Sequence, residues 1–271
     1  MNKNPDLYII CAGMGSRMGG SIPKALVKIT DKPNITTTLQ QIGHKFGHVF
    51  VVTNINNQEP WIEYFEELRR DFPKLSSNVS NVPIQSGRGD GHAVLTAFNE
   101  LQFQSRVQLS DECVIAWGDV FFPDQRIIDE LLEVKLTGKD IGLVPVRWVD
   151  NPYVTLVTKR DKTITHAEFS KYGELNETGF HDQSVFRFVK PSLHQILSDI
   201  DVALNKNGKY ITNGAEMSLL FVFHHAANYL DSFFKIKILE TEYPTISFNT
   251  LEEVAQIQQE IHNKWTTANR S

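Results

Sequence analysis

Residues 7–24 read LYIICAGMGSRMGGSIPK, and this stretch decides both the fold and the expected chemistry. Its first six residues are apolar and predict a short buried strand. Gly13 and Gly15 follow directly, and because neither carries a Cβ atom, their backbone N–H groups can wrap an anion. Arg17 and Lys24 add positive charge that glycine cannot supply. The stretch therefore predicts a cradle for a polyphosphate; an ordinary glycine-rich turn with two solvated cations is the alternative.

The composition is that of a globular protein. The chain has 271 residues, a length that is enough for one large α/β domain or two small ones, and 41% of the residues are hydrophobic. The formal net charge of −5 gives no basic field for nucleic acid, so any anion site must be local. No apolar stretch reaches the roughly 20 residues that span a bilayer, and no signal-peptide pattern opens the chain. We therefore expect a cytoplasmic protein without nucleic-acid or membrane partners.

The two cysteines, Cys11 and Cys113, both lie in apolar strand-like runs. We expect buried free thiols rather than a disulfide, which fits a reducing compartment. The sequence holds no Cys/His spacing typical of a metal site.

Strand-like runs alternate with helical patterns over the first 150 residues. Strands are expected at residues 7–12, 48–53, 82–85, 113–117 and 141–146, and helices at residues 35–46, 61–70, 92–101 and 127–136. This alternation predicts an α/β fold with a doubly wound, mostly parallel mixed sheet. Such a sheet binds ligands outside the carboxyl ends of its strands.

The second half predicts a small antiparallel subregion. Residues 153–159 and 163–169 flank a turn at 160–162, which indicates a hairpin. Further strands are expected at residues 184–189, 234–239 and 245–248, and helices at residues 191–204, 215–230 and 251–264. Because no repeat or low-complexity linker interrupts the chain, we expect residues 1–271 to form a single domain with halves at 1–150 and 151–271.

A second glycine-rich stretch, residues 85–94, leads into the helix expected at 92–101. Three glycines in five residues fit a backbone that turns sharply or lies against a flat ligand, and the helix N-terminus offers free N–H donors. A flexible connector is the alternative. His92 fits an ordinary position in the first turn of the helix.

Two polar residues are candidates for holding a cation. Asp119 follows the most hydrophobic expected strand, and a carboxylate there needs a partner, such as a divalent cation beside a polyphosphate. A cap or turn aspartate is the alternative. Asn249 precedes a capping box that Thr250 and Glu253 would form, so its side-chain oxygen is left free for a hard cation. A plain turn residue is the alternative for Asn249.

Taken together, these sites resemble those of the nucleotidyltransferase superfamily of sugar-phosphate pyrophosphorylases and MobA-like NTP transferases. The first loop is similar to the family signature G-x-G-x-R-x5-P-K, with matches at Gly13, Gly15, Arg17, Pro23 and Lys24.

The later motifs resemble the same family in the same order. Gly91-His92-Ala93 is similar to its second loop, which in uridylyltransferases packs on the nucleotide base. Asp119 and Asn249 resemble the residues that hold its catalytic magnesium ion.

The resemblance implies a Rossmann-like fold of the GT-A type, with a nucleotide-binding half at residues 1–150 and, at 151–271, an acceptor-binding half with a closing helix. It implies transfer of a nucleoside monophosphate from a triphosphate, CTP or UTP, to a sugar phosphate or small phospho-alcohol, with Mg²⁺ as cofactor and pyrophosphate as product. Sugar-nucleotide biosynthesis for cell-surface polysaccharide is the expected setting, and homo-oligomerisation is left open.

The resemblance also implies roles for individual residues. Arg17 and Lys24 would be catalytic, and Asp119 and Asn249 would bind the metal. The nucleotide would contact Ala12, Gly13, Met14, Gly15, Ser16, Gln85, Gly91 and His92. The acceptor would contact Glu168, Lys171 and Glu216.

Some positions depart from the family pattern. Arg88 and Asp90 stand where family members often have a shorter Gly-Thr-Gly segment, which leaves the base open, and residues 179–184 have no assigned role. No C-terminal β-helix is expected, and so no acetyltransferase half of the kind found in bifunctional relatives. The alternatives are a MobA-like guanylyltransferase and a non-catalytic nucleotide-binding module. An oxidoreductase would need glycine at Met18, and a glycosyltransferase would show an Asp-x-Asp motif.

Overall fold

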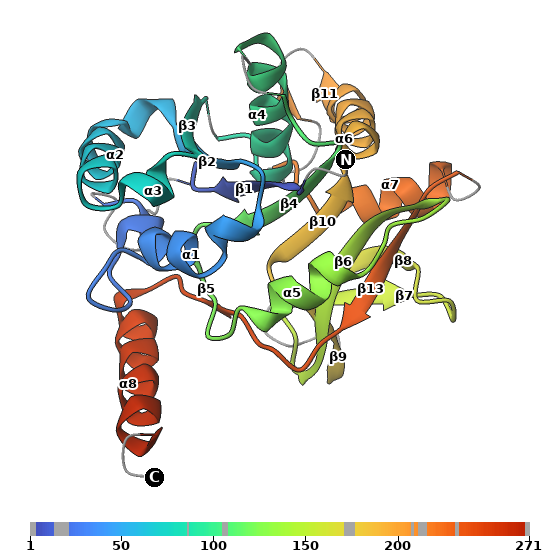
Figure 1. Ribbon diagram of the computed structural model, residues 1–271. Coiled ribbons are helices and arrows are strands. Elements are labelled where there is room, and N and C mark those ends of the chain that lie inside the picture. The colour runs from blue at the N-terminus through green and yellow to red at the C-terminus, as the bar shows by residue number, and fades with distance from the viewer. Residues whose placement is uncertain are drawn as a thin grey trace.

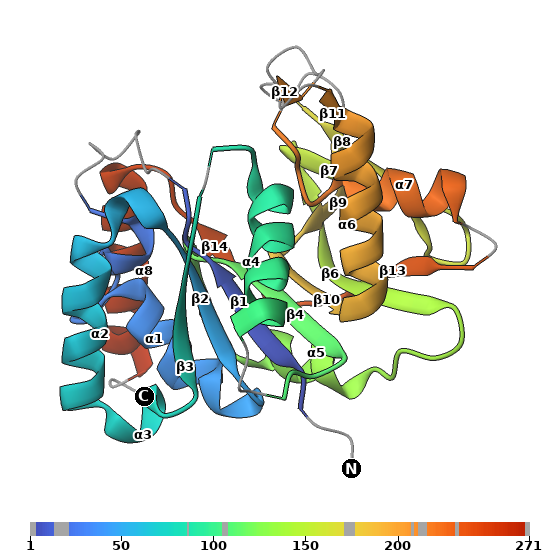
Figure 2. The ribbon, with the colours of Figure 1, turned by 90° about the horizontal axis from the view of Figure 1, so that it is seen from above.

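A mixed eight-stranded sheet separates two layers of helices (Figures 1 and 2). The computed structural model describes residues 4–13, 22–85, 87–104, 108–170, 177–206, 209–210, 216–230 and 233–268. The strand order is β13-β6-β10-β4-β1-β2-β3, and β9 pairs with β6. These strands are β1 (Asp6–Ile10), β2 (Val49–Asn54), β3 (Val79–Ile84), β4 (Glu112–Trp117), β6 (Asp140–Asp150), β9 (Thr178–Asp182), β10 (Val185–Val189) and β13 (Lys235–Glu240).

The directions of the strands show where the carboxyl edge of the sheet lies. β1 is parallel to β2 and β4, and β2 is parallel to β3. β10 is antiparallel to both β4 and β6, and β13 is parallel to β6. β6 therefore runs in the same direction as β4, and the carboxyl ends of β1, β4 and β6 share one edge of the sheet. The expected doubly wound, mostly parallel mixed sheet is confirmed.

The first strand shows why the two helical layers form. All five residues of β1 are buried, because helices cover both faces of the sheet. Leu7 and Ile9 pack with α1 (Asn34–Ile42), α2 (Glu59–Asp71) and α5 (Arg126–Glu133). Tyr8 and Ile10 pack with α4 (Asp90–Gln104), α6 (Lys190–Leu204) and α7 (Phe221–Tyr229).

Smaller elements complete the fold. The hairpin expected after residue 153 is confirmed as β7 (Val154–Thr158) and β8 (Ile164–Phe169), which pair antiparallel. β5 (Val120–Phe121) pairs with β14 (Ile246–Ser247), and α8 (Leu251–Ala268) packs beside them through Val254 and Ile257. The remaining short elements are η2 (Lys24–Leu26), η3 (Gly43–Lys45), η4 (Ile55–Asn57), α3 (Pro73–Ser76), β11 (Asn205–Lys206) and β12 (Lys209–Tyr210).

Several expected elements have other bounds in the structure, and one strand was not expected. α7 begins at Phe221 rather than near residue 215, because the backbone at Met217 bonds another loop instead of starting a helix. α5 ends at Glu133 rather than near residue 136. At this helix end the Arg187 guanidinium donates to the carbonyls of Leu131 and Val134. β9 was not expected as a strand.

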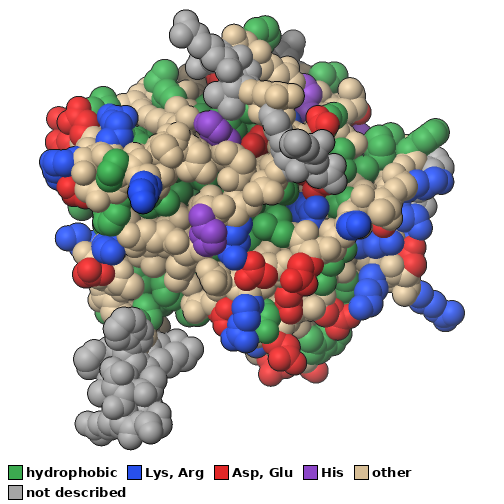
Figure 3. All heavy atoms as spheres, viewed as in Figure 1, with side chains coloured by type: hydrophobic (Ala, Val, Ile, Leu, Met, Phe, Trp, Pro, Cys, Tyr) green, Lys and Arg blue, Asp and Glu red, His purple; other side chains and the backbone are tan. Residues whose placement is uncertain are grey.

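Three further features are the distribution of charge on one face, the state of the two thiols, and the character of the helices. Lys and Arg side chains are interspersed with acidic ones on the face seen in Figure 3 rather than gathered into one basic field. Cys11 and Cys113 are both free, and burial raises the pKa of each thiol. Among the described helices, none combines the length and apolar character needed to cross a bilayer.

Candidate functional site

Three side chains far apart in the sequence meet at the carboxyl edge of the sheet. Lys24 Nζ donates hydrogen bonds to Asp119 Oδ2 at 2.9 Å and to Asn249 Oδ1 at 2.8 Å. Lys24 opens η2, Asp119 follows β4, and Asn249 precedes α8. The Lys24 and Asp119 side chains are only 20% and 27% exposed, so water screens this ion pair partially. We call these residues the cation corner; it unites one expected catalytic residue with both expected metal ligands.

Buried packing fixes the backbone on both sides of Asp119. The Gly118 amide donates to the Ile10 carbonyl at 2.9 Å, and a Cβ atom at Gly118 would clash with Cys11 Sγ. Asn34 Nδ2 donates to the carbonyls of Gly118 and Val120, at 3.2 and 2.9 Å. Asn34 is 1% exposed and holds the turn that presents the carboxylate. The only sign of this role in the sequence is a polar residue at the start of a helix.

Strand pairing and a helix cap position Asn249. Ser247 pairs with Val120, and the Phe248 amide donates to the Asp119 carbonyl at 3.1 Å. The expected capping box is confirmed: the Thr250 amide donates to Glu253 Oε2 at 3.1 Å, and the Glu253 amide donates to Thr250 Oγ1 at 3.2 Å. Glu253 Oε2 also accepts the Asn249 amide. The helix start therefore holds the Asn249 backbone while its side chain points to Lys24.

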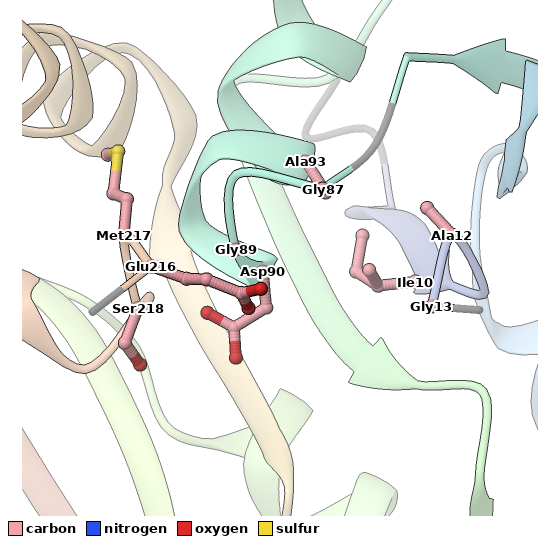
Figure 4. Close-up of a pocket in the computed structure, with 10 residues that line it drawn as sticks. All are labelled: Ile10, Ala12, Gly13, Gly87, Gly89, Asp90, Ala93, Glu216, Met217 and Ser218. Atoms are coloured by element: carbon pink, nitrogen blue, oxygen red, sulfur yellow. The ribbon is translucent and has the colours of Figure 1, made fainter. Parts of the chain in front are cut away.

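A cavity of about 310 Å³ opens at the end of β1 (Figure 4). Three segments line it: the end of β1 and the first loop, the second loop with the start of α4, and the segment before α7. The lining residues are Ile10, Ala12, Gly13, Gly87, Gly89, Asp90, Ala93, Glu216, Met217 and Ser218. Of the first-loop residues expected to bind nucleotide, Ala12 and Gly13 line this cavity. Met14, Gly15, Ser16 and Arg17 lie outside the described residues.

The glycines around the cavity are of two kinds. No described atom lies within 4 Å of a Cβ built at Gly13 or Gly87, so both leave room for a ligand. A Cβ at Gly89 would lie 2.7 Å from Met217 N, and one at Gly91 would lie 2.9 Å from Leu219 N. The sequence could not separate these two kinds, because glycine near a ligand and glycine under another backbone look alike.

Three other residues expected to bind nucleotide, Gln85, Gly91 and His92, do not line the cavity. Gln85 is exposed. His92 Nε2 lies 3.0 Å from Arg88 Nη1, and His92 Nδ1 lies 3.4 Å from Thr96 Oγ1. Burial, with help from the Arg88 charge, lowers the pKa of His92. Within the described chain His92 supports the second loop, as its position in the first turn of the helix suggested.

The residues expected to bind the acceptor are spread out. Glu216 lines the cavity, whereas Glu168 lies on β8, where its Oε1 is 3.3 Å from His166 Nε2. Lys171 lies outside the described residues. Residues 179–184 form most of β9 and the turn into β10, where Thr245 bonds to the Gln183 backbone and side chain. This segment supports the end of β4, because the Trp117 amide donates to the Ser184 carbonyl at 3.4 Å.

Comparison with known proteins assigns the chain to a family. The family model of the MobA-like NTP transferase domain matches residues 7–169. The bifunctional protein GlmU of Caldicellulosiruptor saccharolyticus is 25% identical over 230 residues, which cover 80% of this chain and 45% of that protein. A 2-C-methyl-D-erythritol 4-phosphate cytidylyltransferase of Shewanella amazonensis is 31% identical over 90 residues, 33% of this chain and 34% of that protein. The chain thus spans about half, or less, of the length of these curated relatives.

Solved structures share the fold at low sequence identity. UDP-glucose pyrophosphorylase complexed with UDP-glucose superposes with a TM-score of 0.73 at 15% identity, over 96% of this chain and 99% of that one. HddC from Yersinia pseudotuberculosis gives a TM-score of 0.62 at 16% identity, over 95% of this chain and 99% of that one. These likenesses confirm the Rossmann-like nucleotidyltransferase fold.

Proposed function

The chain belongs to the family of MobA-like NTP transferase domains, and on that basis we propose that it is a nucleotidyltransferase. It would transfer a nucleoside monophosphate from a nucleoside triphosphate to a phosphorylated small molecule and release pyrophosphate. The observation that carries this proposal is the cation corner: an ammonium, a carboxylate and an amide oxygen converge at the carboxyl edge of the sheet, where such folds bind ligands.

The chain's charged residues suit this reaction. A phosphate monoester has a second pKa of ~6, so the acceptor phosphate is mostly dianionic at neutral pH and needs no general base. Catalysis would consist of positioning the two substrates and neutralising the charge on the triphosphate. Lys24 would bind the phosphates, together with Arg17 from the first loop.

The donor set of the cation corner fits Mg²⁺. This ion favours oxygen ligands and takes one or two carboxylates together with substrate phosphates and water. Asp119 Oδ2 and Asn249 Oδ1 are such oxygens, and both already converge on one positive group, Lys24 Nζ. The described residues hold no group of three or more His, Cys, Asp or Glu side chains that could bind a metal, so substrate oxygens would complete the shell. When bound, Mg²⁺ supplies charge neutralisation at the phosphates.

Lys24 and a divalent cation would exclude one another in the cation corner. The ammonium lies within 2.9 Å of both oxygens, and the same two oxygens would be the ones that hold Mg²⁺. With Asp119 and Asn249 holding the metal, Lys24 would be available to bind the negatively charged phosphates. One lysine would thus hold the two ligands in place before the substrate arrives and neutralise phosphate charge afterwards.

The cavity would receive the nucleoside. Gly13 and Gly87 both line it and leave room for a ligand, and Ala12 lines it beside Gly13. We propose a pyrimidine triphosphate, CTP or UTP, as donor, and a sugar phosphate or small phospho-alcohol as acceptor. Glu216, Glu168 and Lys171 would contact the acceptor. The two free thiols suit a reducing compartment such as the cytoplasm, where nucleotide-activated sugars for cell-surface polysaccharide would be made.

The proposal is tested by pairing each of the four nucleoside triphosphates with a panel of sugar phosphates and phospho-alcohols, with and without Mg²⁺, and following pyrophosphate release. We expect release only when a triphosphate, an acceptor and the divalent ion are all present. Failure of every pair to release pyrophosphate, and of every candidate product to exchange labelled pyrophosphate, would contradict the proposal. Nucleotide binding that does not depend on Mg²⁺ would then favour a non-catalytic binding module.

A further inference from the structure

Backbone hydrogen bonds join the segment before α7 to the second glycine-rich loop. The Met217 amide donates to the Arg88 carbonyl, and the Gly91 amide donates to the Met217 carbonyl, both at 2.9 Å. The close approach at Gly89 and Gly91 leaves no room for a Cβ atom on either glycine. Residues 216–219 and the loop at 88–91 therefore form one unit, which we call the cavity wall.

The Asp90 side chain holds the two segments of this wall together by hydrogen bonds. Its Oδ1 accepts the Leu219 amide at 2.7 Å, and its carboxylate also accepts the Gly91 amide and a hydrogen bond from the Ser218 side chain. Asp90 itself lines the cavity, and Glu216 lies beside it (Figure 4). A single carboxylate thus bonds both segments of the wall, one from residues 1–150 and one from residues 151–271.

We propose that Asp90 is a positioning residue, whose carboxylate holds residues 216–219 against the second loop and so sets the wall that both substrates contact. This inference rests on the proposed function and assigns Asp90 no part in the chemical step. Two backbone hydrogen bonds would remain without the carboxylate, so the wall would loosen rather than detach. Substrates would then bind more weakly, while Lys24 and Asp119, on other elements, would act as before.

The chain offers a matched control at the opposite edge of the sheet. Asp6 is 3% exposed and its Oδ2 accepts the Ser110 amide at 2.7 Å, so it also fastens one backbone segment to another. Asp6 begins β1, whereas the cavity lies at the end of that strand. Loss of either carboxylate removes the same kind of bond, and only Asp90 adjoins the cavity.

The experiment compares Asp90→Ala, Asp90→Asn and Asp6→Ala. Loosening the wall would remove contacts that the substrates make equally in the ground state and the transition state, and such a loss raises KM without lowering kcat. For Asp90→Ala we therefore expect KM for both substrates to rise by about tenfold with kcat within about threefold of wild type. Asp90→Asn keeps an acceptor oxygen and should recover most of the loss. Asp6→Ala should lower Tm and leave both KM values unchanged.

Hydrogen–deuterium exchange gives a readout that does not depend on turnover. The Leu219 amide should exchange faster in Asp90→Ala and near the wild-type rate in Asp6→Ala. Unchanged KM values in Asp90→Ala, or protection of Leu219 in that variant, would overturn the positioning role. If Asp90→Ala fails to fold, a KM rise in Asp90→Asn of at least twofold with normal kcat supports the role, and wild-type KM values overturn it. If the wild type shows no turnover with any substrate pair, the proposed function fails, and the exchange rates still decide whether Asp90 holds the wall.

Discussion

The cation corner and the cavity wall are built in opposite ways. In the corner, the Lys24 side chain bonds two other partly exposed side chains, and the backbones of Asp119 and Asn249 are held independently by Asn34, by β14 and by the start of α8. In the wall, backbone groups bond backbone groups, and the Asp90 carboxylate adds bonds from backbone amides and from the Ser218 side chain. Changes in the corner should therefore alter chemistry while the fold persists, whereas changes in the wall should alter stability and affinity together.

The largest expected effect is in the corner. Lys24→Ala should lower kcat by roughly 10²–10³-fold, the usual loss when a donor that stabilises developing charge is removed. Tm should stay close to wild type, because the lysine side chain is partly exposed. Pyrophosphate release measures the first quantity and calorimetry the second. Lys28→Ala, which removes an exposed lysine from the same stretch, is the control. Unimpaired turnover in Lys24→Ala would remove Lys24 from the proposed mechanism.

Paired glycine substitutions separate the wall from the open side of the cavity. Gly91→Ala places a methyl group 2.9 Å from Leu219 N and should lower the free energy of unfolding by about 1–3 kcal/mol. Gly13→Ala meets no described atom within 4 Å, so stability should hold while nucleotide affinity falls. Denaturant unfolding and calorimetric titration measure the two quantities. Equal stability of the two variants would show that the wall is not tightly packed.

Asn34 tests how far the corner depends on its buried support. Asn34→Ala removes donors from the Gly118 and Val120 carbonyls and should cost about 1–3 kcal/mol of stability. Turnover should also fall severalfold, because Asp119 lies between those carbonyls. Asn54 is the control: it is 7% exposed, and its side chain accepts the Asn56 amide away from the corner. If Asn34→Ala and Asn54→Ala lose the same stability and neither loses turnover, Asn34 has no role in presenting Asp119.

Loss of the Lys24 ammonium should also change metal affinity. Whereas it lowers kcat, it should strengthen the binding of a divalent cation. In the absence of nucleotide, Lys24→Met should bind Mn²⁺ severalfold more tightly than wild type, because Asp119 and Asn249 are then released from the ammonium. Electron paramagnetic resonance of free Mn²⁺ gives this affinity directly. Asp119→Asn should weaken Mn²⁺ binding in the same assay. Equal or weaker binding by Lys24→Met would show that lysine and metal do not compete.

The smallest expected effect is a pH dependence of the wall. Burial raises the pKa of Asp90 from 3.8 to about 6, against the lowering effect of its bonds to Leu219, Gly91 and Ser218. Between these two pH values the folded protein binds more protons than the unfolded chain, so the contribution of Asp90 to stability falls as the pH rises. Asp90→Asn cannot titrate. The difference in Tm between Asp90→Asn and wild type should therefore change between about pH 4 and 6 and level off above about 7. A constant difference across this range would contradict the raised pKa.

Much of the fold was predictable, because its signals are local. The apolar run at the start of β1 and the alternation of strands with helices are properties of neighbouring residues. β9 and the start of α7 were not predictable in this way. β9 is a strand because it pairs with the distant end of β6, and residues 216–219 are not helical because their amides bond Arg88 and Asp90 instead.

The residues of the candidate site also fall into those with a local signal in the sequence and those without one. Lys24, Asp119 and Asn249 were expected from residue type and from their places at strand or helix ends, and the structure brings them together. Asn34 and the wall were missed, because a buried amide and a fastening carboxylate resemble ordinary polar residues in a sequence. Their roles depend on which backbone groups lie opposite them.

The sequence by itself determined the family, the sheet with its two helical layers, and the residues able to hold phosphate and cation. It did so because glycine spacing, apolar periodicity and charge are written along the chain. Only the tertiary structure decided that Gly13 and Gly87 are open while Gly89 and Gly91 lie under another backbone. The physical reason is that such roles arise from packing between segments more than 100 residues apart, and no local pattern records which segments will meet.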